Sequence, residues 1–122
     1  MKSYTDIEQS KKLAEILPLE SADMTWEKVT KSLTEDFTWK PTIGLNGSIK
    51  DNLFSYRNGY VLPCWSLAAL LKIIPYASLE EYNGCWGCNS YNKENHAHIF
   101  GKITDNPVDA CYDIILKLNK NN

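Results

Sequence analysis

The stretch of residues 61–75, VLPCWSLAALLKIIP, constrains the fold more than any other part of the sequence, because it is almost entirely apolar. Only Ser66 and Lys72 are polar in its central part. A helix that is apolar on nearly every side must lie in a core. Pro63 suits a first helical turn and Pro75 cannot continue a helix, so the stretch predicts a core helix of about three turns.

Two further helices are predicted near the ends of the chain. Thr5 and Glu8 have the spacing of a capping box, and Pro18 ends the helical segment that they open. Towards the C-terminus, Asn106 can cap a helix whose first residue is Pro107. The apolar residues that follow share one helical face; they are Val108, Cys111, Ile115 and Leu118.

Residues 25–61 carry the signals of strands and turns. Aromatic residues alternate there with polar neighbours, as expected for half-buried strands, at Phe37, Trp39, Phe54 and Tyr56. The Asn-Gly pairs at 46–47 and 58–59 suit the positive φ angles of tight hairpin turns. The region therefore predicts a small, mainly antiparallel sheet.

These elements together predict the α+β class. A chain of 122 residues is long enough to bury one core without disulfides or a structural metal. We therefore expect a single compact domain over residues 1–122, with about three helices packed on the sheet.

The charge and the hydropathy pattern narrow the choice of partners. The chain has 13 Lys and Arg against 15 Asp and Glu, a net charge of −2. Because nucleic-acid binding relies on a basic patch, we expect no nucleic-acid partner. No signal peptide and no apolar run of about 18 residues is present, so we expect a cytoplasmic protein without membrane association. Its four cysteines should then be free thiols.

The first candidate for chemistry is a metal site. Cys85 and Cys88, with His96 and His98, offer two thiolates and two imidazoles, the number that tetrahedral zinc requires. The two histidines, however, are separated by a single residue, which is closer than in the usual zinc sites. The same Cys-x-x-Cys spacing occurs in redox pairs, but no helix signal follows it here.

A hairpin offers a simpler explanation of this segment. If residues 92–95 form the loop, Tyr91 pairs with His96, and Cys85 and Cys88 fall on opposite faces of one strand. The core-facing residues of the hairpin are then Trp86, Cys88, Ser90, Ala97, Ile99 and Ile103. We therefore expect no cofactor and no metal here, and zinc stays an alternative that requires a tight turn in place of the strand.

Cys64 is the second candidate, because the predicted core helix would begin beside it and a helix N-terminus lowers the pKa of a thiol. The Cys64-Trp65 pair resembles the Cys-Trp that opens the central helix of papain-like proteases and transglutaminases. That resemblance implies a later His and then an Asp or Asn, an order met by His96 or His98 followed by Asp105 or Asn106. The glycines and the Gln that papain-like enzymes place before the Cys are absent. A cysteine hydrolase or acyltransferase stays an alternative to a buried core thiol.

Three stretches of the chain are informative together: ILPLESADM (16–24), LPCWSLAALL (62–71) and DNPVDACYDIILKL (105–118). They resemble a family of short bacterial proteins from Bacteroides-type genomes and their phages or mobile elements. The resemblance implies a discrete domain, and it implies no activity, cofactor or catalytic residue. Residues 25–61 match nothing in that family and form the variable, β-rich segment.

The sequence therefore favours a small cytoplasmic accessory or interaction domain without catalysis. Its partner would be a protein that the sequence does not identify, and its oligomeric state stays open. The predicted partner surface consists of aromatic residues in the variable segment, namely Trp26, Trp39, Tyr56 and Tyr60. The alternative is that these residues pack into the core.

Overall fold

The computed structural model describes residues 2–30, 36–43 and 53–120, which group into two compact units. We name Asp6–Trp65 the N-terminal unit, and Met1–Thr5 together with Ser66–Asn122 the C-terminal unit. Each unit contains one three-stranded antiparallel sheet with helices beside it. The α+β class predicted from the sequence is therefore confirmed.

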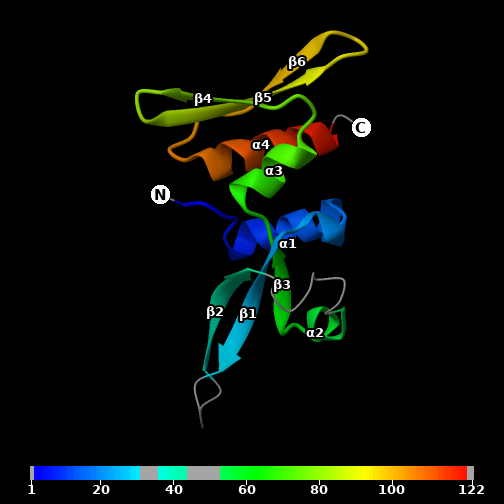
Figure 1. Ribbon diagram of the computed structural model, residues 1–122, viewed down its shortest axis with the longest axis vertical. Helices are drawn as coiled ribbons and strands as arrows, with labels where there is room; N and C mark the ends of the chain where they lie inside the picture. The colour runs from blue at the N-terminus through cyan, green and yellow to red at the C-terminus, as the bar shows by residue number, and fades with distance from the viewer. Residues whose placement is uncertain (1, 31–35, 44–52, 121–122) are drawn as a thin grey trace. The chain divides into compact units, whose positions relative to one another are not determined.

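In the N-terminal unit, strand β1 is the centre of the sheet and pairs with antiparallel neighbours on both sides, in the order β2-β1-β3 (Figure 1). The elements are α1 (Ile7–Ile16), a short 3₁₀ helix (Leu19–Ser21), β1 (Met24–Thr30), β2 (Phe37–Ile43), α2 (Leu53–Arg57) and β3 (Val61–Cys64). Helix α1 contacts β3, and the fully buried side chains of this unit include Leu13, Cys64 and Trp65. The Trp65 Nε1–H donates a hydrogen bond of 3.0 Å to Ser21 Oγ.

Helix α1 begins one residue later than the sequence indicated. Asp6 is the N-cap, and its carboxylate accepts from the Gln9 N–H at 2.8 Å while Gln9 Oε1 accepts from the Asp6 N–H at 3.2 Å. The predicted Thr5–Glu8 box is therefore wrong by one position, because the Asp-x-x-Gln pair satisfies the same orphan N–H groups. The helix ends at Ile16, before Pro18, as predicted.

The segment expected to be a strand before Asn58-Gly59 is helix α2. Gly59 has φ +79° and follows the helix as a left-handed cap. Its N–H donates to Tyr56 O at 3.1 Å, and the Tyr60 N–H donates to Ser55 O at 2.8 Å, which is the Schellman pattern. The hairpin prediction is wrong here because Asn-Gly suits a helix C-terminus as well as a hairpin. Asn46-Gly47 lies outside the described residues.

The apolar stretch 61–75 is divided between a strand and a helix. Pro63 lies in β3, an edge strand, where a missing N–H is tolerated. Helix α3 (Leu67–Ile73) begins only after Ser66, whose Oγ accepts from the Ala69 N–H at 3.2 Å. The prediction of a helix from Pro63 is therefore wrong at its start, because Ser66 supplies the N-cap.

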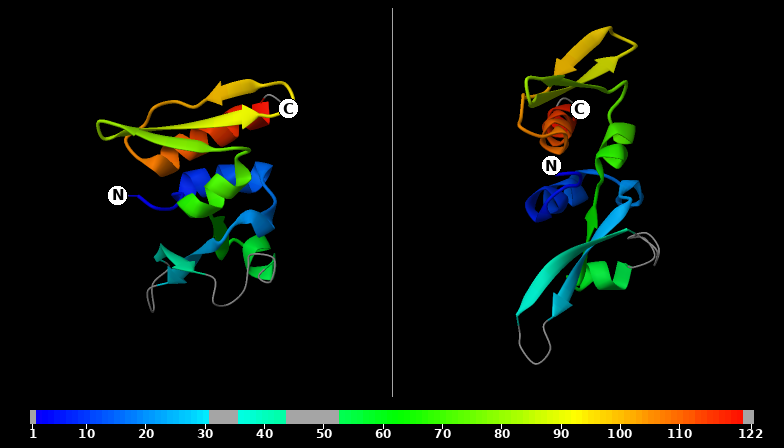
Figure 2. Two further views of the ribbon diagram at one scale, coloured as in Figure 1. Left: turned by 45° about the horizontal axis from the view of Figure 1, so that its top comes forward. Right: turned by 60° about the vertical axis from the view of Figure 1, so that its left-hand side comes forward.

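The C-terminal unit packs helix α4 along one face of its sheet (Figures 1 and 2). The sheet order is β4-β5-β6, with bounds Ser78–Tyr82, Cys85–Asn92 and Ala97–Phe100. Helix α4 (Pro107–Lys120) contacts β5, β6 and α3, and it begins as predicted, since Asn106 Oδ1 accepts from the Asp109 N–H at 2.9 Å. Its buried residues are Pro107, Val108, Ala110, Cys111, Ile114 and Ile115.

Candidate functional site

The two cysteines of the Cys-x-x-Cys segment lie on opposite faces of strand β5, as the hairpin interpretation predicted. Cys85 is exposed, whereas Cys88 is fully buried. The zinc alternative required a tight turn in place of this strand. Among the residues that the structure describes, no group of three or more His, Cys, Asp or Glu side chains could hold a metal ion. The geometry therefore gives no support to a site built from Cys85, Cys88, His96 and His98.

The two histidines lie close to Tyr91, but the pairing differs from the expected one. Tyr91 pairs with His98, and Asn92 pairs with Ala97, so the loop contains residues 93–96. His96 lies in this loop with φ +56°. The predicted loop was one residue too early, because Asn92 belongs to the strand and His96 to the turn. His98 nevertheless lies on the face opposite Cys88, as predicted, because the predicted and the observed pairing differ by an even number of positions.

Ile103 does not face the core, although the alternation predicted that it would. Gly101 follows the register of β6, with its N–H donating to Cys88 O at 3.0 Å, but Thr104 pairs with Trp86. One extra residue therefore lies between these two contacts, as in a β-bulge, and Ile103 is 58% exposed. Sequence alternation alone could not reveal a bulge.

Cys64, the candidate nucleophile, is fully buried in strand β3 and does not begin a helix. Both premises of the hydrolase hypothesis, an accessible thiol and a helix N-terminus beside it, are therefore missing. The proposed partners of Cys64 belong to the other unit, where His96 and His98 are exposed. Asp105 accepts a hydrogen bond from Asn106 Nδ2 at 3.1 Å beside the start of α4.

A candidate site that the sequence did not suggest covers the sheet face opposite α4. We name it the outer face and define it by the side chains of Tyr76, Ser78, Glu80, Asn89, Tyr91, His98 and Phe100. The pairing explains why they gather: Ser78 and Phe100 both pair with Asn89, and Tyr91 pairs with His98. Directly opposed residues of a sheet share one face.

The rings of the outer face form a continuous row. The Tyr91 and His98 rings are 4.8 Å apart between centroids, and the His98 and Phe100 rings are 5.9 Å apart and nearly parallel. Tyr76 approaches Tyr91 edge to face at 6.2 Å, and the Tyr91 hydroxyl is 2.7 Å from His96 Nδ1. Tyr76 and Phe100 are each 64% exposed, so apolar ring surface is left in water.

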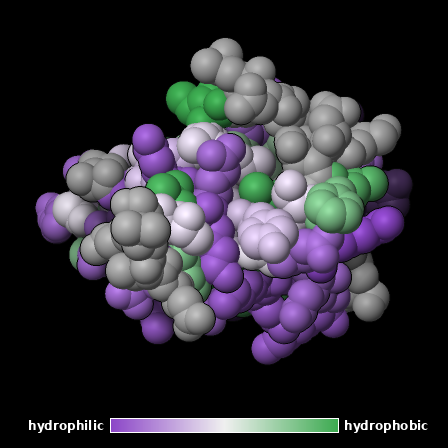
Figure 3. Space-filling model, turned by 90° about the horizontal axis from the view of Figure 1, so that it is seen from below, coloured by the Kyte–Doolittle hydropathy of each residue, from purple (hydrophilic) through white to green (hydrophobic). Residues whose placement is uncertain are grey.

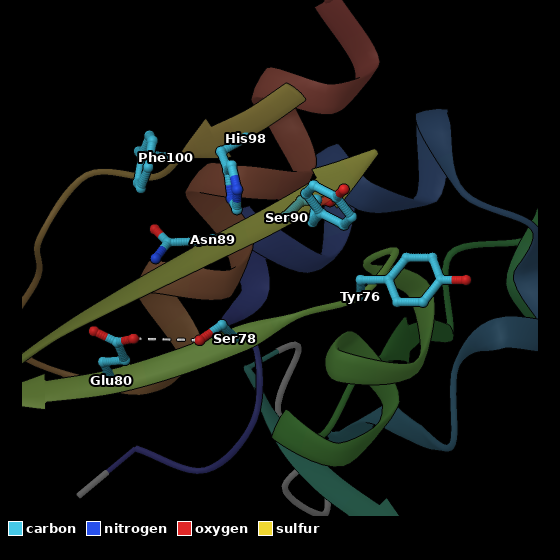
Figure 4. Close-up of a pocket in the computed structure, with 8 residues that line it drawn as sticks. Tyr76, Ser78, Glu80, Asn89, Ser90, His98 and Phe100 are labelled. Carbon is cyan, nitrogen blue, oxygen red and sulfur yellow. Dashed lines mark hydrogen bonds between the residues drawn. The ribbon is translucent and has the colours of Figure 1, made fainter. Parts of the chain in front are cut away.

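A polar row from β4 and β5 runs beside the rings, and Figure 4 shows both rows around one hollow. The hollow has a volume of about 280 Å³ and is lined by the outer-face residues together with Ser90. Ser78 Oγ donates to Glu80 Oε1 at 3.4 Å, and the Tyr82 hydroxyl donates to Glu80 Oε2. The Asn89 side-chain amide makes no hydrogen bond to another described residue and is available to a ligand.

Tyr76 has an unfavourable backbone conformation for its residue type. It follows Pro75 with φ +46°, in the pattern of a type II turn, where glycine or asparagine is usual. A bulky residue in the left-handed region costs on the order of 1 kcal/mol. The turn thus places an exposed ring at the edge of the hollow, beside Tyr91, at a cost in stability.

The aromatic residues expected to form a surface in the N-terminal unit are more dispersed. Tyr60 is exposed, whereas Trp26, Trp39 and Tyr56 are half-buried. Lys28 Nζ lies 4.0 Å from the Phe37 ring centroid, so that ring is already covered by a cation. On the face that Figure 3 shows, hydrophobic residues form separate patches among hydrophilic ones.

A buried pair of thiols lies under the other face of the same sheet. Cys88 of β5 and Cys111 of α4 are both fully buried, and their side chains are hydrogen-bonded to each other. This hydrogen bond, together with burial, raises the pKa of Cys111, while it lowers the pKa of Cys88 against the effect of burial. The pair fills the core between sheet and helix.

Comparisons of the chain with protein-family models, curated proteins and solved structures found no match. The resemblance to the Bacteroides-type family therefore stays a prediction. Within the described ranges, no helix is long and apolar enough to cross a membrane.

Proposed function

We propose that this protein is a small, non-catalytic interaction domain that binds its partner on the outer face of the β4-β5-β6 sheet. The observation that carries the proposal is the row of rings beside a hollow on a sheet whose opposite face is packed by α4. Exposed aromatic side chains that border a concave surface are the usual anchors of binding sites.

The conformation of Tyr76 supports a role in binding. A glycine at this position would relieve the positive φ angle, yet the chain has a tyrosine whose ring is exposed and adjoins the hollow. Strain that stability alone does not explain is typical of residues retained for recognition.

The proposal places the protein in the cytoplasm and allows the phage or mobile-element origin that the sequence resemblance suggests. The four cysteines, all free thiols, support a reducing compartment. The buried state of Cys64 supports binding over thiol catalysis, because a nucleophile needs access to its substrate.

Protein-observed NMR with a library of small fragments tests the proposal while the partner itself is still unidentified. We expect fragments to shift the backbone amide signals of outer-face residues, chiefly Asn89, Tyr91, His98 and Phe100. Fragments that bind only elsewhere, or a library that gives no binding at all, would overturn the proposal.

A further inference from the structure

We infer that the ligand of the outer face is the guanidinium group of an arginine side chain, presented by a partner protein. The inference rests on the proposed function and adds the chemistry of the ligand. It follows from three properties of the hollow: its charge, the free acceptor positions of Glu80, and the exposed rings that also line it.

The charge of the hollow favours a cation. Glu80 contributes a carboxylate, and none of the described residues that line the hollow is Lys or Arg. Lys117 donates to the Phe100 carbonyl oxygen at 3.0 Å, but its ammonium group is also 3.3 Å from the Asp113 carboxylate. An anionic ligand would therefore meet Glu80 with no Lys or Arg among the described lining residues to offset the charge, whereas a cationic ligand would be attracted.

The Glu80 carboxylate is held in place and still has room to accept. Ser78 donates to one of its oxygens and Tyr82 to the other. An ionised carboxylate has about four lone-pair positions, so each oxygen keeps one for a ligand. Two parallel N–H donors match this arrangement, and the guanidinium group supplies such a pair.

The rings select a planar cation. Guanidinium groups are weakly hydrated and stack on aromatic faces, whereas an ammonium group is a compact point charge. Phe100 and Tyr76 expose their rings at the same hollow that Glu80 lines. A hollow of about 280 Å³ that opens on the surface suits one long side chain of a partner. A neutral sugar could also stack there, but it would gain nothing from the formal charge of Glu80.

The test titrates the tripeptide acetyl-Gly-Arg-Gly-amide into the full chain and follows binding through the protein's backbone amide NMR signals. Its Lys and Glu counterparts and the neutral sugar maltotriose are the comparison probes. We expect the Arg peptide to shift outer-face amide signals, the Lys peptide to bind more weakly, and the Glu peptide not to bind.

Two variants and a matched control assign the binding to the proposed groups. Glu80→Gln should lower the affinity for the Arg peptide by at least about tenfold, because it removes charge-assisted hydrogen bonds. Glu81→Gln removes the adjacent exposed carboxylate, which alternation places on the other face of β4, and should change the affinity less than about twofold. Phe100→Ala keeps Glu80 and removes one ring, and should also weaken binding.

The outcomes separate this inference from the proposed function. Equal binding to wild type and Glu80→Gln would overturn the inference, as would binding of maltotriose or of the Glu peptide in place of the Arg peptide. In each of those cases fragments still bind the outer face and the proposed function stands. If neither fragments nor any probe binds there, both proposals fail.

Discussion

The two faces of the β4-β5-β6 sheet are built from alternate residues of the same strands, yet they differ in almost every property. The inner face packs against α4 and carries the buried Cys88. The outer face carries exposed rings, a carboxylate and an amide around a hollow.

The difference shows how period-two alternation separates stability from recognition within one short strand. Side chains on the inner face contribute to folding through burial, and a change there should lower stability. Side chains on the outer face contribute little to folding, so their residue types are free to suit a ligand. The predictions below contrast the two faces, from the largest expected effect to the smallest.

Truncation of a core residue of α4 should give the largest effect. Ile114 is fully buried, and Ile114→Ala should lower the free energy of unfolding by about 2–5 kcal/mol. Phe100→Ala, on the outer face, should change it by less than about 0.5 kcal/mol. Urea denaturation measures both. Equal losses in the two variants would erase the proposed distinction between the faces.

Two glycines near the sheet give a matched pair for the same comparison. A Cβ at Gly101 would lie 2.8 Å from the Cys88 carbonyl oxygen, so Gly101→Ala should cost about 1–3 kcal/mol of unfolding free energy. At Gly87 the nearest side-chain atom is 3.8 Å away, an ordinary contact, so Gly87→Ala should be nearly neutral. Thermal denaturation of both variants would check the order, and a reversed order would contradict the bulged path of the chain after β6.

The buried thiols should make stability fall at high pH. The pKa of Cys111 is raised in the folded state, so the folded protein keeps a proton that the unfolded chain releases as the pH rises through about 8.5. Stability is therefore present below that pH and should fall above it, by up to about 1.4 kcal/mol per pH unit. Urea denaturation from pH 7 to 10 should show a shallower fall in the double variant Cys88→Ala/Cys111→Ala, because burial would still raise the pKa of whichever thiol a single variant left behind. Identical slopes would argue against a buried thiol pair.

Relief of the backbone strain at Tyr76 should give the smallest change in stability. Tyr76→Gly removes the left-handed strain but increases the freedom of the unfolded chain, so we expect a gain of about 0.5 kcal/mol. The same variant should bind outer-face ligands more weakly. Calorimetric unfolding with parallel fragment titration tests both parts, and a loss of stability with unchanged binding would show that the ring serves packing instead.

Much of the fold followed from local signals in the sequence. The N-cap at Asn106, the helix start at Pro107 and the end of helix α1 before Pro18 were predicted because each depends on neighbouring residues alone. The opposite faces of Cys85 and Cys88 followed from strand alternation.

The errors came from signals that serve two structures. Asn58-Gly59 caps a helix instead of joining strands, whereas Asn83-Gly84, with φ angles of +52° and +86°, joins β4 to β5. That second pair is a hairpin signal at the edge of the segment first considered for zinc, and its recognition would have predicted β4.

The candidate site itself could be predicted only from the pairing register of the strands. Tyr91, His98 and Phe100 become neighbours only when Tyr91 pairs with His98, and the sequence did not fix whether His96 belongs to the strand or to the loop. Glu80 joins them through the pairing of β4 with β5, and Tyr76 joins them through its ring contact with Tyr91. Long-range pairing of this kind cannot be read from local spacing.

The most direct test of the central claim is the fragment-binding NMR map measured on wild type and on the double variant Tyr91→Ala/Phe100→Ala. We expect wild-type binding to cluster on the outer face and to be lost in the double variant, while signals of α4 residues such as Ile114 stay unchanged. Fragments that bind both proteins equally would contradict the claim that the outer face is the binding surface.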